Sequence, residues 1–185
     1  MKKILLASLI VTASTASFAV TGDTPAATAT VTNVNGGKVT INGEITAGAC
    51  AISSDDANKI VTLDTVPTHK FTAGNEVANA KKQFDLTLVD CDTSAADTVT
   101  VTFTGMGVDG IPGILANTAG AGSAQNIAIQ LYDETGSALD LGTASRVYTL
   151  AQTTPMTFAA DYISTSADVT AGRVSAAANF ELAYQ

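Results

Sequence analysis

The sequence predicts an all-β protein whose strands form a β-sandwich. Short segments in which apolar and polar residues alternate recur along the chain, and Gly, Asp and Asn separate them. No long amphipathic helical pattern is evident. Aromatic residues make up 5% of the chain and Trp is absent, whereas Ala, Thr, Val and Gly are abundant. This composition suits closely packed sheets with small side chains.

The first 19 residues have the pattern of a secretory signal peptide. Met1-Lys2-Lys3 is positively charged, the run from Ile4 to Ala16 is apolar, and Ser17-Phe18-Ala19 has the small-x-small form of a cleavage site. The apolar run is too short to span a bilayer, so we expect no stable membrane insertion. We predict cleavage after Ala19 and an exported chain that begins at Val20.

Removal of this segment would leave a more acidic chain. Loss of Lys2 and Lys3 lowers the basic residues from 9 to 7 against 17 acidic residues, which changes the net charge from −8 to −10. Nucleic acid and anionic membrane surfaces are therefore poor partners. The acidic residues are scattered, and we interpret them as surface residues that maintain solubility. The remaining chain, about 166 residues, is long enough for one domain.

The segment after the predicted cleavage site has two parts. Residues 20–33 are rich in Thr and Ala and contain little to bury, so we expect them to be disordered on their own. Residues 38–45 alternate strictly, which gives an extended strand one apolar face. This strand is either the first strand of its own domain or a detachable strand that completes another molecule. Its apolar face consists of Val39, Ile41, Gly43 and Ile45.

Cys50 and Cys91 are the two cysteines of the chain. In an exported protein, an isolated pair of cysteines indicates a disulfide more strongly than a metal site or a redox centre. A catalytic thiol would need a nearby His, and the chain has one His in total. We therefore predict a structural disulfide between these residues.

Several segments of the main body show the alternation of β-strands. We predict strands over residues 59–66, 84–88, 99–103, 127–131 and 156–162. The stretch 105–126 is rich in Gly and Ala, and we expect it to form a long loop. No internal repeat is evident.

The end of the sequence predicts one more strand, over residues 172–185. Its apolar residues alternate up to the penultimate position, and no later segment of the sequence can cover its edge. We therefore expect this edge to pair with another polypeptide, although an ordinary last strand of a self-sufficient sandwich would show the same alternation. The apolar face consists of Val174, Ala176, Ala178, Phe180, Leu182 and Tyr184.

The pattern of residues does not indicate catalysis or metal binding. His69 follows Pro67 in a predicted turn, where a solvated loop residue is the simplest interpretation. The Gly-x-Ser-x-Gly motif of serine hydrolases is absent from the sequence. The Asp residues lack the spacing of a calcium-binding loop. We expect neither catalytic residues nor a metal or other cofactor.

Four parts of the sequence resemble major pilins of the type 1 fimbrial family, which is assembled by the chaperone–usher route. The run from Val34 to Cys50 resembles the start of such pilins, and residues 84–93 resemble the strand that carries their second cysteine. Residues 130–136 resemble their mid-domain turn, and Tyr184 resembles their C-terminal signature. The four patterns occur in the order of the family, although the part before Val34 is several residues longer than is usual.

This resemblance implies an incomplete immunoglobulin-like β-sandwich that lacks its final strand. Residues 46–185 would be the pilin domain, and residues 20–45 would be an N-terminal extension that carries a donor strand. In this family, a periplasmic pilus chaperone lends a strand to the groove, and the N-terminal segment of the next subunit later replaces it. The strand over residues 38–45 would be the donor, and the last strand would be the acceptor edge.

The function implied by the resemblance is that of a structural subunit of an adhesive surface fimbria. The partners would be neighbouring pilin subunits in a homopolymer, the periplasmic chaperone and an outer-membrane usher, with export through the periplasm to the cell surface. The sequence leaves open a minor adaptor pilin. It also leaves open a secreted β-sandwich adhesin that binds host glycans through loops such as 105–125. Glycan binding that survives deletion of residues 20–43 would favour the adhesin.

Overall fold

The computed structural model describes residues 38–41, 43, 45 and 48–185. The predicted signal peptide and the predicted disordered stretch, residues 1–19 and 20–33, lie outside these described residues. The chain divides into the units Met1–Gly43 and Glu44–Gln185, and every described strand belongs to the second unit. Within the described part of the chain, no helix is long and apolar enough to cross a membrane.

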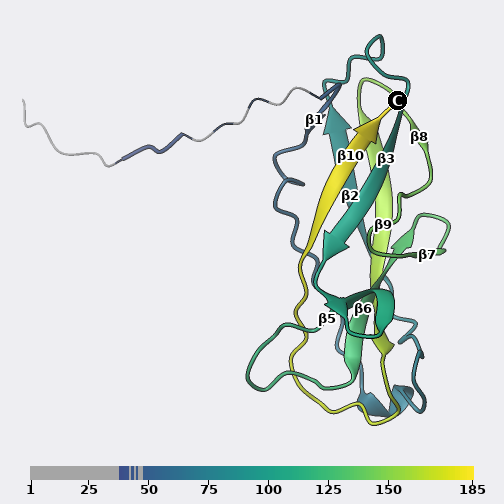
Figure 1. Ribbon diagram of the computed structural model, residues 1–185. Helices are drawn as coiled ribbons and strands as arrows, with labels where there is room; N and C mark the ends of the chain where they lie inside the picture. The colour runs from purple at the N-terminus through teal and green to yellow at the C-terminus, as the bar shows by residue number, and fades with distance from the viewer. Residues whose placement is uncertain (1–37, 42, 44, 46–47) are drawn as a thin grey trace, which may run out of the picture. The chain divides into compact units, whose positions relative to one another are not determined.

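The described strands form two antiparallel sheets, which confirms the predicted all-β fold class (Figure 1). The larger sheet has seven strands in the order β1-β2-β9-β6-β5-β4, with β7 paired to β6, and the smaller sheet has the order β10-β3-β8. A short 3₁₀ helix, η1, spans Thr68–Lys70. The strands are β1 Ala51–Ile52, β2 Lys82–Val89, β3 Thr98–Gly105, β4 Gly107–Val108, β5 Ile111–Ala116, β6 Ile127–Asp133, β7 Ala138–Leu139, β8 Tyr148–Thr149, β9 Thr154–Ser164 and β10 Ala178–Tyr184.

The alternation of residue types determines which face of each strand is buried. In β3, Val99 and Val101 are 0% exposed and Phe103 is 4% exposed, while the Thr residues between them lie on the other face because successive side chains of a strand point to opposite sides. In β9, Met156 and Phe158 are also completely buried. The inward residues of the two strands belong to one core cluster.

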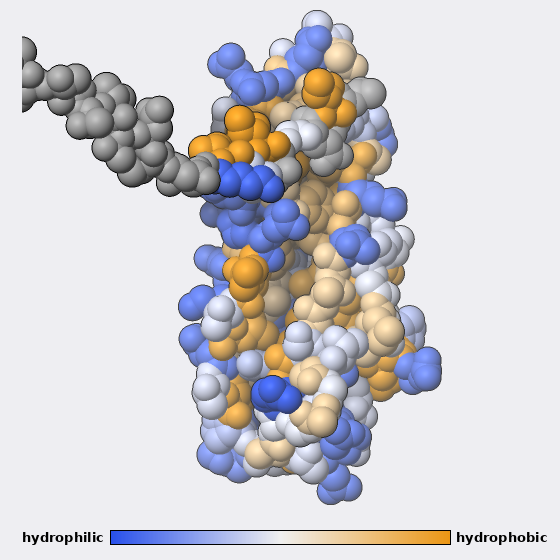
Figure 2. Space-filling model, turned by 90° about the vertical axis from the view of Figure 1, so that its left-hand side faces the viewer, coloured by the Kyte–Doolittle hydropathy of each residue, from blue (hydrophilic) through white to orange (hydrophobic). Residues whose placement is uncertain are grey.

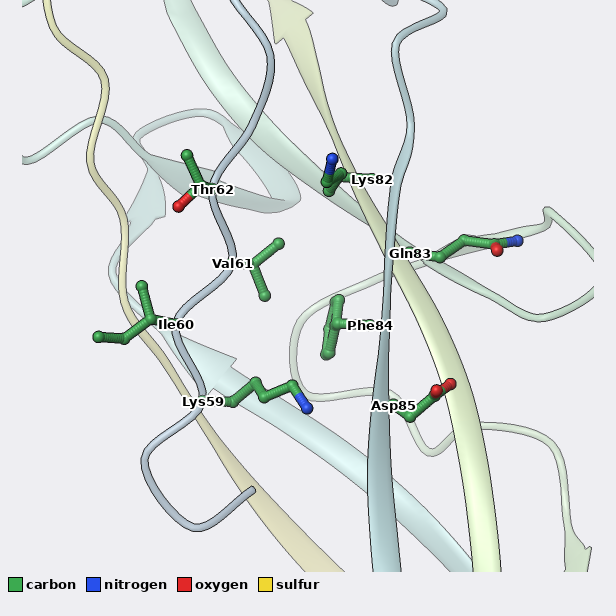
Figure 3. Close-up of a pocket in the computed structure, with 8 residues that line it drawn as sticks. All are labelled: Lys59, Ile60, Val61, Thr62, Lys82, Gln83, Phe84 and Asp85. Atoms are coloured by element: carbon green, nitrogen blue, oxygen red, sulfur yellow. The ribbon is translucent and has the colours of Figure 1, made fainter. Parts of the chain in front are cut away.

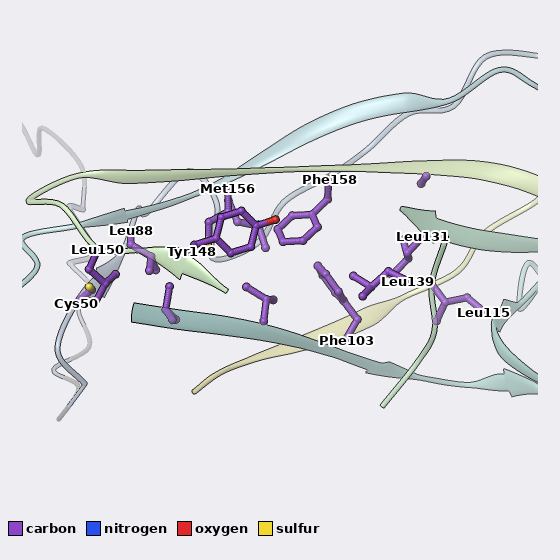
Figure 4. Packing of buried hydrophobic residues seen from close by; sticks show 14 of the residues in the cluster. Cys50, Leu88, Phe103, Leu115, Leu131, Leu139, Tyr148, Leu150, Met156 and Phe158 are labelled. Atoms are coloured by element: carbon purple, nitrogen blue, oxygen red, sulfur yellow. The ribbon is translucent and has the colours of Figure 1, made fainter. Parts of the chain in front are cut away.

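Phe158 lies at the centre of this core. Its ring centroid is 5.0 Å from that of Phe103 in an edge-to-face arrangement, and lies 5.9 Å from Phe84 and 6.1 Å from Tyr148. Figure 4 shows Phe103 and Phe158 pointing toward each other from β3 and β9, which belong to different sheets. Such edge-to-face pairs are a favourable geometry for aromatic rings. The hydroxyl group of Tyr148 is buried here without a hydrogen-bond partner among the described residues.

The predicted disulfide between Cys50 and Cys91 is confirmed. It joins the chain just before β1 to the residues just after β2. A second link in this region is made by Asp56, which is 5% exposed and accepts hydrogen bonds from Lys59 Nζ at 2.6 Å and from the backbone N–H of Thr87 at 2.8 Å. Together these contacts hold the segment after β1 against β2.

Three sequence predictions differ from the structure. Residues 59–66 form no strand, because no described strand pairs with them to supply ladder hydrogen bonds. The stretch 105–126 is not one loop, since it contains the hairpin of β4 and β5. The last strand begins at Ala178 rather than near residue 172, because the residues before it bond to the loop 117–124 instead of β3.

Candidate functional site

The two edges of β10 are in different situations. One edge pairs with β3 along its whole length, from Ala178 opposite Gly105 to Tyr184 opposite Val99. The pairing continues to Gln185, whose carbonyl oxygen accepts from the backbone N–H of Thr98 at 3.0 Å. The other edge has no strand partner within the described residues. Its backbone groups are therefore available for another strand.

The inward side chains on this last segment are only half-buried, unlike those of β3. They contact the core, but one side of each stays open, as expected for a sandwich from which a strand is missing. Of the six predicted acceptor residues, Ala178 is exposed. The other five are half-buried, namely Val174, Ala176, Phe180, Leu182 and Tyr184.

Burial affects the chemistry of Tyr184 at the end of this segment. It raises the pKa of the Tyr184 phenol, and a hydrogen bond from the backbone of Cys50 partly offsets this rise. The phenol is therefore uncharged at neutral pH. A Cβ atom at Gly48 would lie 3.2 Å from the Tyr184 ring, so the glycine allows the chain to pass close to the ring.

A second wall faces the uncovered strand. It consists of β2 and the segment 59–66, in which Leu63 is half-buried against the core. Between residues 59–62 and β2 lies a side pocket of about 290 Å³. Figure 3 shows Val61 and Phe84 pointing into this space from opposite sides, while Ile60 points away. Consistent with this, Ile60 is 89% exposed.

A larger pocket of about 450 Å³, here called the end pocket, lies where the chain approaches β10. Residues 65–71 form one wall, and residues 169–174 form the other. Ile127 and Tyr162 also line it. Figure 2 shows a hollow that runs lengthwise along this face with hydrophobic side chains along it. We call the hollow between β10 and the segment 59–66, together with the end pocket, the open groove.

The predicted donor residues expose apolar surface. Val39 is 86% exposed, Ile41 is 89% exposed and Ile45 is 100% exposed. Gly43 is also exposed, and a Cβ atom there would meet nothing within 4 Å. None of these four residues lies in a strand. Three large apolar side chains at alternate positions thus remain open to solvent.

The described residues show no arrangement suited to metal binding, since they contain no group of three or more His, Cys, Asp or Glu side chains that could hold an ion. His69 lies in η1 and is exposed.

The sequence did not identify two parts of the open groove. Leu63 and Phe84 had been predicted only as strand residues. Val174 had been predicted on the acceptor face, but residues 169–171 of the same wall had been assigned no role. Alternation marks which side chains face inward, but it does not show that two inward-facing segments leave a space between them.

Comparison with known proteins connects this arrangement to a family. The family described as fimbrial protein matches residues 39–185. The type-1 fimbrial protein A chain of Escherichia coli strain K12 is 38% identical over 165 residues, which cover 86% of this chain and 90% of the relative. The type-1 fimbrial protein C chain of Escherichia coli is 35% identical over 158 residues, which cover 84% of this chain and 87% of the relative.

Solved structures agree with these relatives. A chain from a chaperone–usher pilus, in a structure described as revealing the basis of rod uncoiling, matches with a TM-score of 0.69 and 27% identity, and the match covers 85% of this chain and 100% of the other. The P pilus rod subunit PapA matches with a TM-score of 0.63 and 27% identity over 75% of this chain and 100% of that one. The fold is therefore the incomplete immunoglobulin-like fold of pilins.

Proposed function

The chain belongs to the fimbrial protein family, and on this premise we propose that it is a structural subunit of an adhesive surface fimbria that polymerises by donor-strand exchange. In this process, residues 38–45 of one copy would fill the open groove of another copy. The family consists of structural proteins and not of enzymes.

One observation carries the proposal. The chain has both an incomplete core and an exposed apolar segment of matching character. The inward side chains of β10 are half-buried, and Val39, Ile41 and Ile45 are 86–100% exposed. Addition of a strand to an exposed sheet edge is a general mode of protein recognition, and assembly of chaperone–usher pili is a known instance of it.

The sheet geometry suggests a direction for the donor. Every strand pair among the described residues is antiparallel, so we expect the donor to run antiparallel to β10. Its C-terminal end would then lie at the start of the acceptor segment, which places Ile45 near the end pocket beside Val174. Gly43 would mark a position where the two backbones approach closely.

The free energies expected from burial and hydrogen bonding of the donor strand favour polymerisation. Burial of Val39, Ile41 and Ile45 at roughly 1.5–3 kcal/mol each would contribute on the order of 5–9 kcal/mol. Each backbone hydrogen bond of the new ladder would add about 0.5–1.5 kcal/mol. A whole domain is typically stable by only about 5–15 kcal/mol. The free energy contributed by the inserted strand would therefore be comparable to the net stability of a typical whole domain.

The same magnitudes explain why a carrier would be needed before assembly. A lone subunit exposes both a strand edge and apolar side chains, a combination that promotes aggregation. A periplasmic chaperone that covers the groove would prevent this until an outer-membrane usher receives the subunit. Delivery through the periplasm to a cell-surface fimbrium follows from this sequence of steps.

The proposal can be tested on material sheared from cells that also produce the chaperone and usher. On an unheated SDS gel we expect a ladder of resistant multimers from the intact chain. Substitution of Ile41→Asp together with Ile45→Asp should abolish the ladder, because burial of two carboxylates in the groove is unfavourable. A stable secreted monomer from both chains would refute the proposal.

A further inference from the structure

The side chain of Asn117 uses its full hydrogen-bonding capacity within the fold. Its Nδ2 donates to the carbonyl oxygens of Ala124 at 2.9 Å and Arg173 at 3.0 Å. Its Oδ1 accepts from the backbone N–H groups of Ala119 at 3.1 Å and Ser175 at 3.0 Å. An amide side chain has two donor hydrogens and two acceptor lone pairs. All four are occupied by backbone groups.

These bonds join two segments that are far apart in the sequence. Ala119 and Ala124 belong to the loop 117–124, whereas Arg173 and Ser175 belong to the segment that leads into β10. Further bonds reinforce the junction. The backbone N–H of Thr118 donates to the carbonyl oxygen of Ser175 at 2.8 Å, and that of Ala124 donates to the carbonyl oxygen of Arg173 at 2.9 Å.

The junction forms the outer support of the end pocket. Three residues at this junction line the end pocket, namely Ala124, Gly172 and Val174. Asn117 bonds directly to the backbone of Ala124. It also bonds to Arg173 and Ser175, which are the chain neighbours of the other two lining residues. The packing is tight, because a Cβ atom at Gly172 would collide with the backbone of Ser123 and Ala124. The position of the wall 169–174 therefore depends on this contact with the loop 117–124.

We infer that Asn117 is a positioning residue that holds the wall of the end pocket in the shape that accepts an apolar donor side chain. This inference rests on the proposed function, and it assigns to the loop 117–124 a role in how fast the donor strand docks. Asn117 is not expected to touch the donor. It acts by fixing Val174 and the backbone of residues 173–175.

The test uses a full chain that carries Ile41→Asp and Ile45→Asp, so that its own donor segment cannot compete. Two fluorescent peptides of residues 34–47 serve as probes, one native and one with Ile45→Ala, and association rates are measured by anisotropy. The Asn117→Asp variant of this chain is compared with the chain that keeps Asn117. The substitution replaces the donating amide group with a carboxylate, which would face the carbonyl oxygens of Ala124 and Arg173 and could not donate to them. Asn75→Asp is the matched control, since Asn75 is exposed, does not line the end pocket and gains the same charge.

We expect Asn117→Asp to slow the native peptide by about tenfold, the loss expected from one or two hydrogen bonds. It should change the association rate of the Ile45→Ala peptide little. The ratio of the association rate of the native peptide to that of the Ile45→Ala peptide should therefore fall toward one. Asn75→Asp should leave both association rates unchanged. Gly172→Ala, which displaces the same wall by a different route, should reproduce the selective loss.

Two results would overturn the inference while leaving donor-strand exchange intact. In the first, Asn117→Asp and Gly172→Ala bind the native peptide as fast as the unchanged chain does. In the second, both peptides slow by the same factor, which would indicate general destabilisation rather than a change in the end pocket. If neither peptide binds the chain with Asn117 unchanged, the proposed function itself is wrong.

Discussion

Phe180 of β10 lies directly opposite Phe103 of β3, with ring centroids 6.4 Å apart, yet only one of the two rings is fully covered. Phe103 is 4% exposed, whereas Phe180 is half-buried. Two neighbouring aromatic residues on the same face of one sheet thus differ in burial. The difference marks the boundary between the completed core and the open groove.

This difference in burial predicts that replacing Phe180 with alanine lowers the free energy of unfolding less than replacing a fully buried Phe. Phe158→Ala should destabilise the lone chain by about 3–5 kcal/mol, as is usual for a fully buried Phe. Phe180→Ala should cost clearly less, because solvent already reaches part of its ring. Urea unfolding of both variants measures the two costs. When a donor peptide fills the groove, the cost of Phe180→Ala should rise toward that of Phe158→Ala. Equal costs in the lone chain would contradict this account of the groove.

Tyr148 provides a second prediction about the core. Its hydroxyl group is buried without a hydrogen-bond partner in the described part of the chain, and an unsatisfied buried hydroxyl costs about 1–3 kcal/mol. Tyr148→Phe should therefore leave the melting temperature unchanged or raise it. Tyr148→Leu is the comparison, because it removes the ring that packs against Phe158 and should lower the melting temperature. A clear loss of stability in Tyr148→Phe would show that the hydroxyl is satisfied.

The disulfide should contribute strongly to the stability of the lone chain. Cys50 and Cys91 are 41 residues apart, and a cross-link of this length typically stabilises a protein by about 2–4 kcal/mol. The double variant Cys50→Ser and Cys91→Ser should therefore unfold at lower urea concentration. Addition of a donor peptide should recover part of the loss, because binding to the folded state stabilises it. Unchanged unfolding in the double variant would refute this prediction.

Asp56 should make stability depend on pH. Burial by itself raises the pKa of this carboxyl group, but the hydrogen bonds from Lys59 and Thr87 outweigh it, so the pKa lies below its ordinary value of 3.8. A folded-state pKa below the unfolded value means that the charged form stabilises the fold. This contribution is fully present above the unfolded pKa of 3.8 and is lost as the pH falls through the lower folded pKa.

The corresponding variant is Asp56→Asn, with Asp55→Asn as the control because Asp55 is the exposed neighbour. At about pH 7, Asp56→Asn should lower the free energy of unfolding by roughly 1.5–3 kcal/mol, the contribution expected of hydrogen bonds to a charged group. The difference in unfolding free energy between this variant and the unchanged chain should become smaller below pH 3.8. A gap that stays constant over this range, measured by urea unfolding, would contradict the assigned role.

The sequence predicted those parts of the fold that depend on local alternation. β3 and β9 were found because Val99, Val101, Met156 and Phe158 lie at alternate positions. The hairpin of β4 and β5 was missed although its turn, Asp109-Gly110, is a strong hairpin signal. Gly110 has a φ of +75°, in the left-handed region that favours glycine. The surrounding Gly and Ala residues obscured it.

Other features depend on pairing between distant residues, which a single sequence does not reveal. Residues 59–66 show alternation, but the pattern does not show that a partner strand is absent. The contact between Asn117 and Ser175 spans 58 residues, and nothing in the local sequence indicates it. The apolar faces of both the donor and acceptor segments were visible, whereas the end pocket between them was not.

The central claim is that one copy supplies a strand to the groove of another, and mixing two defective chains tests it most directly. The first chain carries Ile41→Asp and Ile45→Asp and lacks a working donor. The second carries Ala176→Asp, which places a charge in the groove at a small, half-buried residue, and lacks a working acceptor. Sedimentation velocity should show each chain alone as a monomer and an equal mixture as a dimer, with nothing larger. A mixture that stays monomeric, or polymers from either chain alone, would contradict donor-strand exchange.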